Sequence, residues 1–184
     1  MNSQIIALDV DDVVLDLVSA WLHRYNVDYN DFLVESNIKT WDIGSYTKIG
    51  HKMYDYLKDP MLYSTVYPVK DSWVGVKTLK NMGYRVIYVT SSTIEQSGIK
   101  YNLLYNTGFL NRREDYFEAT DKSLIRCDYL VDDRIENVEN AYGQGIVYTR
   151  EWNTSLRGYP RVNNWTEIVD FFAKQKDGQE IISV

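Results

Sequence analysis

Four short apolar runs constrain the fold of this chain more than any other feature of its sequence. They span residues 5–8, 84–89, 129–131 and 145–148, and each ends at a polar side chain. Short apolar runs that contain β-branched residues are typical of strands buried in a parallel sheet. Apolar residues recur with helical spacing at 73–82, 99–107 and 165–174, and the tail from 175 to 184 is expected to be loosely ordered. This alternation predicts an α/β fold, with a parallel sheet core flanked by helices on both faces.

The segment 17–69 interrupts the alternation of strands and helices. It combines helical patterns at 18–25 and 49–58 with Gly and Asp turns and many aromatic residues. We interpret it as a small helical cap over the carboxyl edge of the sheet, with residues 1–16 and 70–184 forming the catalytic core. The alternative is a long first crossover helix with loops, but a length of more than fifty residues favours the cap.

Reactive side chains follow three of the four predicted strands. The first strand is followed by Asp9 and Asp11, the second by Thr90 and Ser91, and the third by Asp132 and Asp133, with Lys122 ten residues ahead of Asp132. Ligands of open α/β sheets bind outside the carboxyl ends of the strands, so we expect these groups to converge. A single Asp-x-Asp or Thr-Ser-Ser is more often a turn or a helix cap, and it is the ordered set that indicates function.

The predicted cluster of aspartates needs a cation. Carboxylates that converge without one raise each other's pKa values by several units. Mg²⁺ prefers oxygen ligands and is usually held by one or two carboxylates together with a substrate phosphate. A hydroxyl from Thr90 and an ammonium from Lys122 are suited to holding phosphoryl oxygens. The sequence therefore predicts a magnesium site that acts on a phosphate ester.

Charge and cysteine content narrow the partners. The net charge of −6, from 20 basic and 26 acidic residues, argues against a polymeric nucleic acid, which needs a basic surface. The one cysteine, Cys127, excludes an internal disulfide and fits a reducing compartment. No stretch approaches the length of a membrane span, so we expect a cytoplasmic protein without a membrane partner. The oligomeric state stays open, and a homodimer is one option.

The motifs resemble those of a known superfamily. IIALDVDDVV, VIYVTSS, Lys122 and YLVDDR resemble, in this order, the four motifs of the haloacid dehalogenase (HAD) superfamily, over residues 1–16 and about 70–150. The spacing from Lys122 to Asp132, the Thr90-Ser91 pair and Lys100-Tyr101 are similar to features of the 5'(3')-deoxyribonucleotidases within it. The resemblance implies a HAD-like, Rossmann-type core with a small helical cap inserted after the first strand.

The resemblance also implies roles for individual residues. Asp9 would attack phosphorus to form an aspartyl-phosphate, while Asp11 would protonate the leaving oxygen and then activate water. The implied Mg²⁺ ligands are Asp9, the backbone carbonyl of Asp11 and Asp132, with Asp133 acting through a metal-bound water. The implied phosphate-binding residues are Thr90, Ser91, Lys100 and Lys122. The implied activity is a magnesium-dependent 5'-nucleotidase that hydrolyses nucleoside 5'-monophosphates to nucleoside and phosphate and prefers deoxyribonucleotides.

Two positions depart from the family pattern. Asp12 stands where the family often has Gly, and Leu17 stands where an aromatic residue often stacks on the base. We expect little effect from Asp12, while Leu17 leaves the preferred base open. Trp41 and Tyr46 are the candidates for contact with the base, with Tyr54 as a third. Packing inside the cap is equally compatible with each of these aromatic residues.

Three other functions compete with the nucleotidase. A phosphatase of the same superfamily that acts on a sugar phosphate would carry the same motifs. A receiver domain also uses aspartates, a hydroxyl, a lysine and Mg²⁺. Here, however, Lys122 precedes the strand that ends in Asp-Asp, and a long insertion follows the first strand. An inactive binding relative would be marked by loss of Asp9, Asp11 or Lys122, and all three are present.

Overall fold

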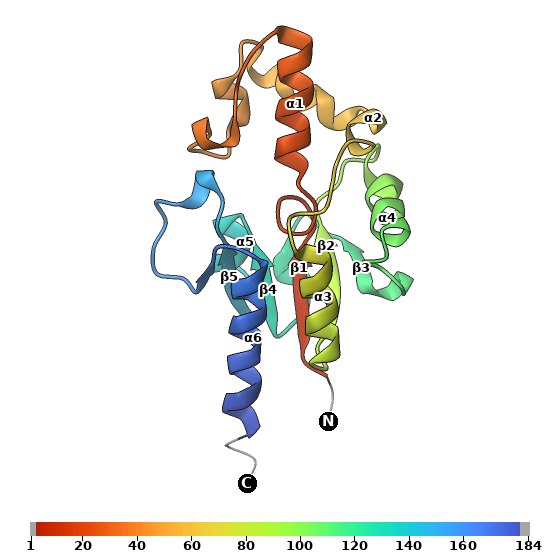
Figure 1. Cartoon of the computed structure of the whole chain (residues 1–184), viewed down its shortest axis with the longest axis vertical. Helices are drawn as coiled ribbons and strands as arrows, with labels where there is room; N and C mark the ends of the chain where they lie inside the picture. The colour runs from red at the N-terminus through yellow and green to blue at the C-terminus, as the bar shows by residue number, and fades with distance from the viewer. Residues whose placement is uncertain (1–2, 181–184) are drawn as a thin grey trace.

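The computed structural model describes residues 3–180. Within this range the chain forms a six-stranded parallel sheet with the strand order β3-β2-β1-β4-β5-β6 (Figure 1). The strands are β1 (Ile5–Asp9), β2 (Arg85–Thr90), β3 (Tyr116–Glu118), β4 (Tyr129–Asp132), β5 (Gln144–Tyr148) and β6 (Arg161–Val162). The predicted α/β fold with a parallel sheet is confirmed. The short edge strands β3 and β6 were not predicted, because neither contains an apolar run.

Helices flank the sheet and also extend beyond it. They are α1 (Leu17–Tyr29), α2 (Pro60–Tyr63), α3 (Ser72–Asn81), α4 (Ser97–Asn106), α5 (Ile135–Glu139) and α6 (Trp165–Glu180). Helices α3 and α6 pack side by side against one face of the sheet (Figure 1). Because α6 continues to Glu180, the loosely ordered tail expected from residue 175 is wrong for 175–180, and residues 181–184 lie outside the described part of the chain.

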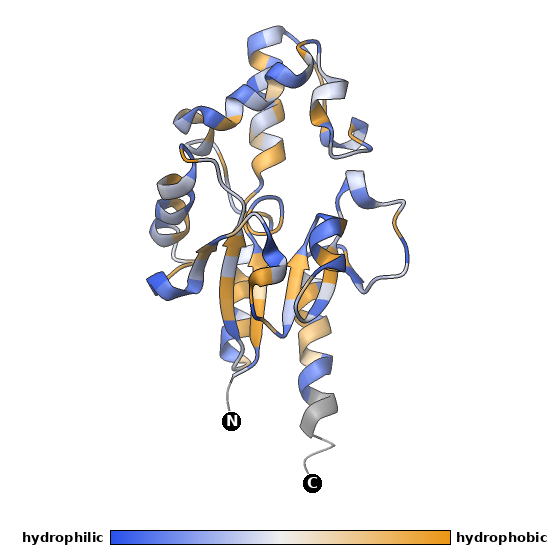
Figure 2. Cartoon of the chain, turned by 180° about the vertical axis from the view of Figure 1, so that it is seen from behind, coloured by the Kyte–Doolittle hydropathy of each residue, from blue (hydrophilic) through white to orange (hydrophobic). Residues whose placement is uncertain are grey.

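The core has two parts because strand side chains alternate between the faces of the sheet. The larger part lies on the side of α3 and α6, where Ile6 and Leu8 of β1 belong to the same buried cluster as Phe172 of α6. A smaller cluster on the opposite face includes Ala7 and Leu130. The strands are largely hydrophobic in Figure 2. A parallel sheet covered in this way keeps the backbone of β1 dry and fixes the position of its carboxyl end.

The segment 17–69 lies beyond the carboxyl ends of the strands (Figure 1). Besides α1 and α2 it contains the 3₁₀ turns η1 (Glu35–Asn37), η2 (Ile43–Tyr46) and η3 (Gly50–Lys58). The predicted helical pattern at 49–58 is therefore a 3₁₀ helix, whereas the one at 18–25 is part of α1. The chain enters this segment from the sheet and later returns to it, and the two connecting stretches run side by side. They are joined by hydrogen bonds from Asp16 N to Tyr67 O (2.8 Å) and from Val69 N to Val14 O (2.9 Å).

Asp12 fixes the start of α1. Its φ of 60° lies in the left-handed region that favours glycine, which accounts for Gly being acceptable at this position. The aspartate adds a function that glycine lacks, because its Oδ1 accepts a hydrogen bond from Val18 N (2.9 Å) in the first turn of α1. Burial raises the pKa of Asp12, although the Arg150 guanidinium opposes this shift. Asp12 thus links the loop after β1 to the helix that rises from it.

The contact between α3 and α6 predicts the effect of a single methyl group. A Cβ added at Gly75 of α3 would lie 2.3 Å from Cε3 of the Trp165 ring, so Gly75→Ala should lower the free energy of unfolding by about 1–3 kcal/mol. The matched control is Gly98→Ala in α4, where an added Cβ would meet no atom within 4 Å. Urea unfolding of both variants measures the difference. Equal stabilities would contradict the packing described here.

Candidate active site

The predicted site residues meet where the strand order reverses. From β1 the chain passes to β2 and β3 on one side, and then to β4, β5 and β6 on the other. Ligands of doubly wound sheets bind at such a switch point, outside the carboxyl ends of the strands. Asp9, Thr90 and Asp132 are the last residues of β1, β2 and β4, so the three strands deliver them to one edge.

Lys122 is buried between two of these carboxylates. It begins the short turn η5 (Lys122–Leu124), and its Nζ donates to Asp9 Oδ1 at 2.5 Å and to Asp132 Oδ2 at 2.7 Å. Burial disfavours the charged ammonium, but Asp132 and Asp9 outweigh this effect and hold the pKa of Lys122 above its usual value. Burial also disfavours the charged carboxylate of Asp9 and so raises its pKa, and Lys122 opposes that shift. Each of these buried charges is therefore stabilised by the opposite charge beside it.

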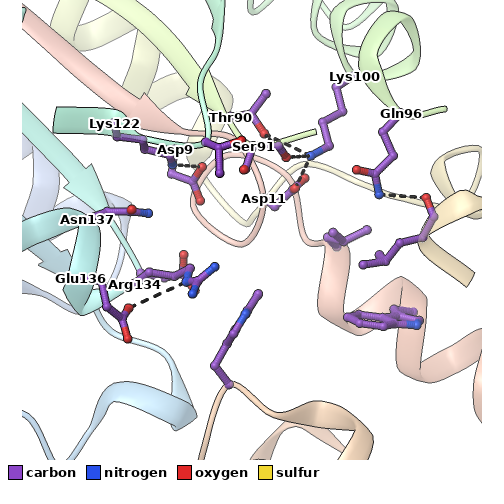
Figure 3. A pocket seen from close by; sticks show the side chains of 16 residues that line it. Asp9, Asp11, Thr90, Ser91, Gln96, Lys100, Lys122, Arg134, Glu136 and Asn137 are labelled. Atoms are coloured by element: carbon purple, nitrogen blue, oxygen red, sulfur yellow. Dashed lines mark hydrogen bonds and ion pairs between the residues drawn. The ribbon is translucent and has the colours of Figure 1, made fainter. Parts of the chain in front are cut away.

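Lys100 forms a second ammonium centre on the β2 side of the site. It is buried on α4, and its Nζ donates to Asp11 Oδ2 (2.5 Å), to Thr90 Oγ1 (3.1 Å) and to the backbone oxygen of Ser91 (2.8 Å) (Figure 3). Three predicted residues, Asp11, Thr90 and Ser91, thus come together around the ammonium group of a fourth, Lys100. The second oxygen of the Asp11 side chain is buried, and within residues 3–180 it has no hydrogen-bond partner.

Three buried carboxylates lie close enough to share a metal ion. Asp9, Asp132 and Asp133 each offer an oxygen, and these atoms lie within 4.8 Å of one another. Asp132 also accepts hydrogen bonds from Arg134 N (2.9 Å) and from Asn137 Nδ2 (3.1 Å to each oxygen). Burial, with the nearby Asp132 and Asp9 charges, raises the pKa of Asp133. An all-oxygen set of this kind fits a hard divalent cation such as Mg²⁺.

These groups open into a cleft of about 390 Å³ between the sheet edge and the segment 17–69. The sheet side of the cleft is polar, with Asp9, Asp11, Thr90, Ser91, Gln96, Lys100, Thr120, Lys122, Asp133, Arg134, Glu136 and Asn137 (Figure 3). The opposite side is apolar and consists of Leu17, Trp21, Trp41 and Leu57. One end of the cleft is therefore suited to an anion, and the other to a flat apolar group.

Of the three aromatic residues that were candidates for contact with the base, one lines the cleft. Trp41 lines the cleft, but Tyr46 and Tyr54 are not among its lining residues. The Tyr46 hydroxyl instead accepts a hydrogen bond from Lys39 N (3.1 Å), and the Tyr54 ring packs edge-on against Trp21. The Tyr46 and Tyr54 side chains thus make their contacts within the segment 17–69, and base contact by either residue stays a prediction.

Several cleft residues were not identified from the sequence. Trp21 could have been found, because it follows Leu17 by one helical turn and shares its face of α1. Arg134 lies within the motif that supplies Asp132 and Asp133, and its guanidinium lies 5.3 Å from the centre of the Trp41 ring. Asn137 carries no comparable sequence signal, since only the turn into α5 brings it to Asp132.

Comparison with known proteins identifies the family. The family model described as 5' nucleotidase, deoxy (pyrimidine), cytosolic type C protein matches residues 3–176. The chain belongs to this family. The predicted kinship with the 5'(3')-deoxyribonucleotidases is thereby confirmed, and so is the prediction of an enzyme of the nucleotidase class.

Relatives of full length support this assignment. The 5'(3')-deoxyribonucleotidase of Bacillus subtilis is 30% identical over 167 residues, which cover 90% of this chain and 96% of that protein. The 5'(3')-deoxyribonucleotidase of Clostridium acetobutylicum is 27% identical over 179 residues, covering 96% of this chain and 99% of the relative. The similarity therefore extends over the sheet and over the segment 17–69.

Solved structures agree on the fold. A HAD-family hydrolase from Deinococcus radiodurans, with bound phosphate and sodium, has a TM-score of 0.63 at 12% identity and covers 94% of this chain and 96% of its own. A HAD hydrolase from Bacillus subtilis, solved bound to magnesium, has a TM-score of 0.59 at 14% identity, covering 93% and 99%. In the described range 3–180, none of the helices is long and apolar enough to span a bilayer.

Loss of the bridging ammonium should be costly for folding. Lys122→Met would leave Asp9 and Asp132 buried without their counter-charge, and breaking a buried ion pair in this way costs about 3–5 kcal/mol. We expect that loss in urea unfolding with EDTA, and a partial recovery with Mg²⁺. The matched control is Lys58→Met, which removes only an exposed pair with Asp55 and should have a small effect. A Lys122→Met protein as stable as the wild type in EDTA would refute the bridging role.

Proposed function

We propose that this chain is a magnesium-dependent 5'-nucleotidase that hydrolyses deoxyribonucleoside 5'-monophosphates to nucleoside and phosphate through an aspartyl-phosphate on Asp9. The observation that carries the proposal is the cleft itself, in which two buried ammonium groups and a carboxylate cluster face an apolar wall. Membership of a family described as deoxy (pyrimidine) nucleotidases supports the choice of substrate class. Because cleft volume and polarity match a mononucleotide, we favour it over larger phosphate esters.

The cation site is proposed from the buried carboxylates. Asp9, Asp132 and the backbone carbonyl of Asp11 would hold Mg²⁺, and Asp133 would act through a water. When bound there, Mg²⁺ would neutralise charge on the phosphoryl group and orient it toward the nucleophile. Lys122 already contacts Asp9 and Asp132, so it would hold the two carboxylates close together and offset part of their negative charge.

Asp9 and Asp11 divide the proposed chemistry. A carboxylate oxygen of Asp9 attacks phosphorus in line, forming a new P–O bond as the bond from phosphorus to the nucleoside oxygen breaks. Asp11 gives its proton to that leaving oxygen, and then takes a proton from the water that hydrolyses the aspartyl-phosphate. The contact between Lys100 and Asp11 bears on this cycle, because an arriving phosphate would compete with the Asp11 carboxylate for the same ammonium and so free the Asp11 side chain to reach the leaving oxygen.

The phosphate and the base would occupy opposite ends of the cleft. Thr90, Ser91 and Lys100 form one side of the proposed phosphate site, and Lys122 forms the other. The base would lie against Trp41 on the apolar wall, with Trp21 close by. We propose that the segment 17–69 acts as the cap of a core formed by 1–16 and 70–184, and that it excludes water and large substrates.

A substrate panel tests the proposed activity. Phosphate release is measured with Mg²⁺ and with EDTA across dUMP, dTMP, dCMP, dGMP, dAMP, UMP, a 3'-monophosphate and two sugar phosphates. We expect metal-dependent release that is stronger from nucleotides than from sugar phosphates, because the apolar wall favours a flat base, and strongest from the pyrimidine deoxynucleotides named in the family description. Release mainly from sugar phosphates would retain the chemistry and overturn the substrate. No release from any compound would favour an inactive binding relative.

Asp9→Asn tests the proposed nucleophile. The amide cannot form the aspartyl-phosphate, so turnover should fall by at least about a thousandfold. The fold and Mg²⁺-dependent phosphate binding should largely persist. The matched control is Asp12→Asn, three residues further along the chain, where the side chain is also buried and the amide oxygen can still accept the hydrogen bond from Val18 N. Near-normal turnover in the Asp9→Asn protein would exclude Asp9 as the nucleophile.

A further inference from the structure

The connection between β5 and β6 contacts both ends of the cleft, although it carries none of the sequence motifs. Its turn η6 (Glu151–Asn153) contains Trp152, which is buried behind the cleft and is not one of the residues that line it. Two lining residues, Asp133 and Trp41, both contact Trp152. The one side chain therefore touches the carboxylate cluster and the apolar wall at once.

On the cation side, Trp152 holds the Asp133 side chain. Its indole Nε1 donates to Asp133 Oδ2 at 2.7 Å, and among the described residues it is the one hydrogen-bond donor to this carboxylate. Asn153, the next residue, donates to the backbone oxygen of Asp133 at 2.8 Å. An indole N–H only donates and does not titrate, so it fixes one carboxylate oxygen and leaves the other for the cleft.

On the apolar side, Trp152 packs against Trp41. The two ring centres are 5.3 Å apart with an angle of 62° between the planes, an edge-to-face contact that sets the tilt of Trp41. The flanking residues of the turn are tied to the same part of the chain, because Arg150 pairs with Glu35 (3.2 Å) and Glu151 with Lys39 (2.6 Å). The turn is thus held to the segment that carries Trp41.

We propose that Trp152 is a positioning residue that couples the cation site to the apolar wall, its N–H orienting the Asp133 carboxylate and its ring orienting Trp41. The inference rests on the proposed function and goes beyond the four motifs. Trp152 touches neither cation nor substrate and acts through its two neighbours. Mg²⁺ binding and nucleotide binding should therefore each favour the other.

Trp152→Phe separates the two contacts, since it keeps an aromatic ring beside Trp41 and removes the donor to Asp133. Loss of an outer hydrogen-bond partner typically weakens metal binding by 10–100-fold, so we expect the Mg²⁺ Kd from calorimetry to rise about tenfold. The matched control is Trp165→Phe, which removes another buried indole N–H, one that donates to Val13 O at 2.8 Å. Its Mg²⁺ Kd should be unchanged.

A double-mutant cycle shows whether Trp152 acts through Asp133. Asp133→Asn weakens Mg²⁺ binding by itself, and Trp152→Phe should add nothing further in that background. Saturating Mg²⁺ should restore kcat in Trp152→Phe, which general damage to the fold would not allow.

Trp152→Leu tests the contact with Trp41, because it removes both the donor to Asp133 and the ring beside Trp41. Its KM for the deoxynucleotide should therefore stay raised at saturating Mg²⁺.

The outcomes separate this inference from the proposed function. Wild-type and Trp152→Phe proteins that bind Mg²⁺ equally well, or additive effects in the cycle, would overturn the inference alone. A wild-type protein that binds no Mg²⁺ would overturn the proposed function and the inference together.

An NMR experiment on the wild-type chain needs no variant. Mg²⁺ should shift the Trp152 indole N–H signal and leave unshifted the signal of Trp73, whose indole N–H donates to Thr107 O. An unshifted Trp152 signal would also overturn the inference.

Discussion

Burial of negative charge at the end of β1 and β4 is the constraint on which the rest of the structure depends. An unpaired carboxylate is strongly unfavourable in a dry site, and Asp9 and Asp132 lie in such a site together. Lys122 makes the arrangement possible by bridging these two carboxylates, and Lys100 pairs with Asp11 beside β2. Removing one partner of a buried ion pair costs far more than the pair contributes. The two lysines therefore hold η5 and α4 against the carboxylates at the end of the sheet.

The cleft joins two surfaces with different physical character. The sheet edge supplies charge and hydrogen-bond donors, while the segment 17–69 supplies Leu17, Trp21, Trp41 and Leu57 as an apolar wall. Phosphate chemistry needs the first surface, and selection of the group attached to the phosphate needs the second. The sequence motifs belong to the sheet edge alone, which is why they indicate a reaction more sharply than a substrate. Contacts such as that between Trp152 and Trp41 connect the two.

The central strands could be predicted because their signal is local. A run such as 5–8 is apolar throughout, since both faces of a parallel sheet are covered, and the polar residue that follows marks the carboxyl end of the strand. Strands β3 and β6 lack that signal, because they are short and lie at the edges of the sheet. The 3₁₀ form of η3 also escaped prediction, because apolar spacing does not distinguish it from an α-helix over nine residues.

The sequence by itself determined the order of the reactive groups and the sheet edge at which Asp9, Thr90 and Asp132 would meet, because strand ends in a parallel sheet point the same way. Only the tertiary structure decided which aromatic side chains face the cleft, selecting Trp41 and adding Trp21 while using Tyr46 elsewhere. It also brought Trp152 to Asp133, nineteen residues away along the chain. Such contacts depend on how loops fold back over the sheet, and no local periodicity encodes that path.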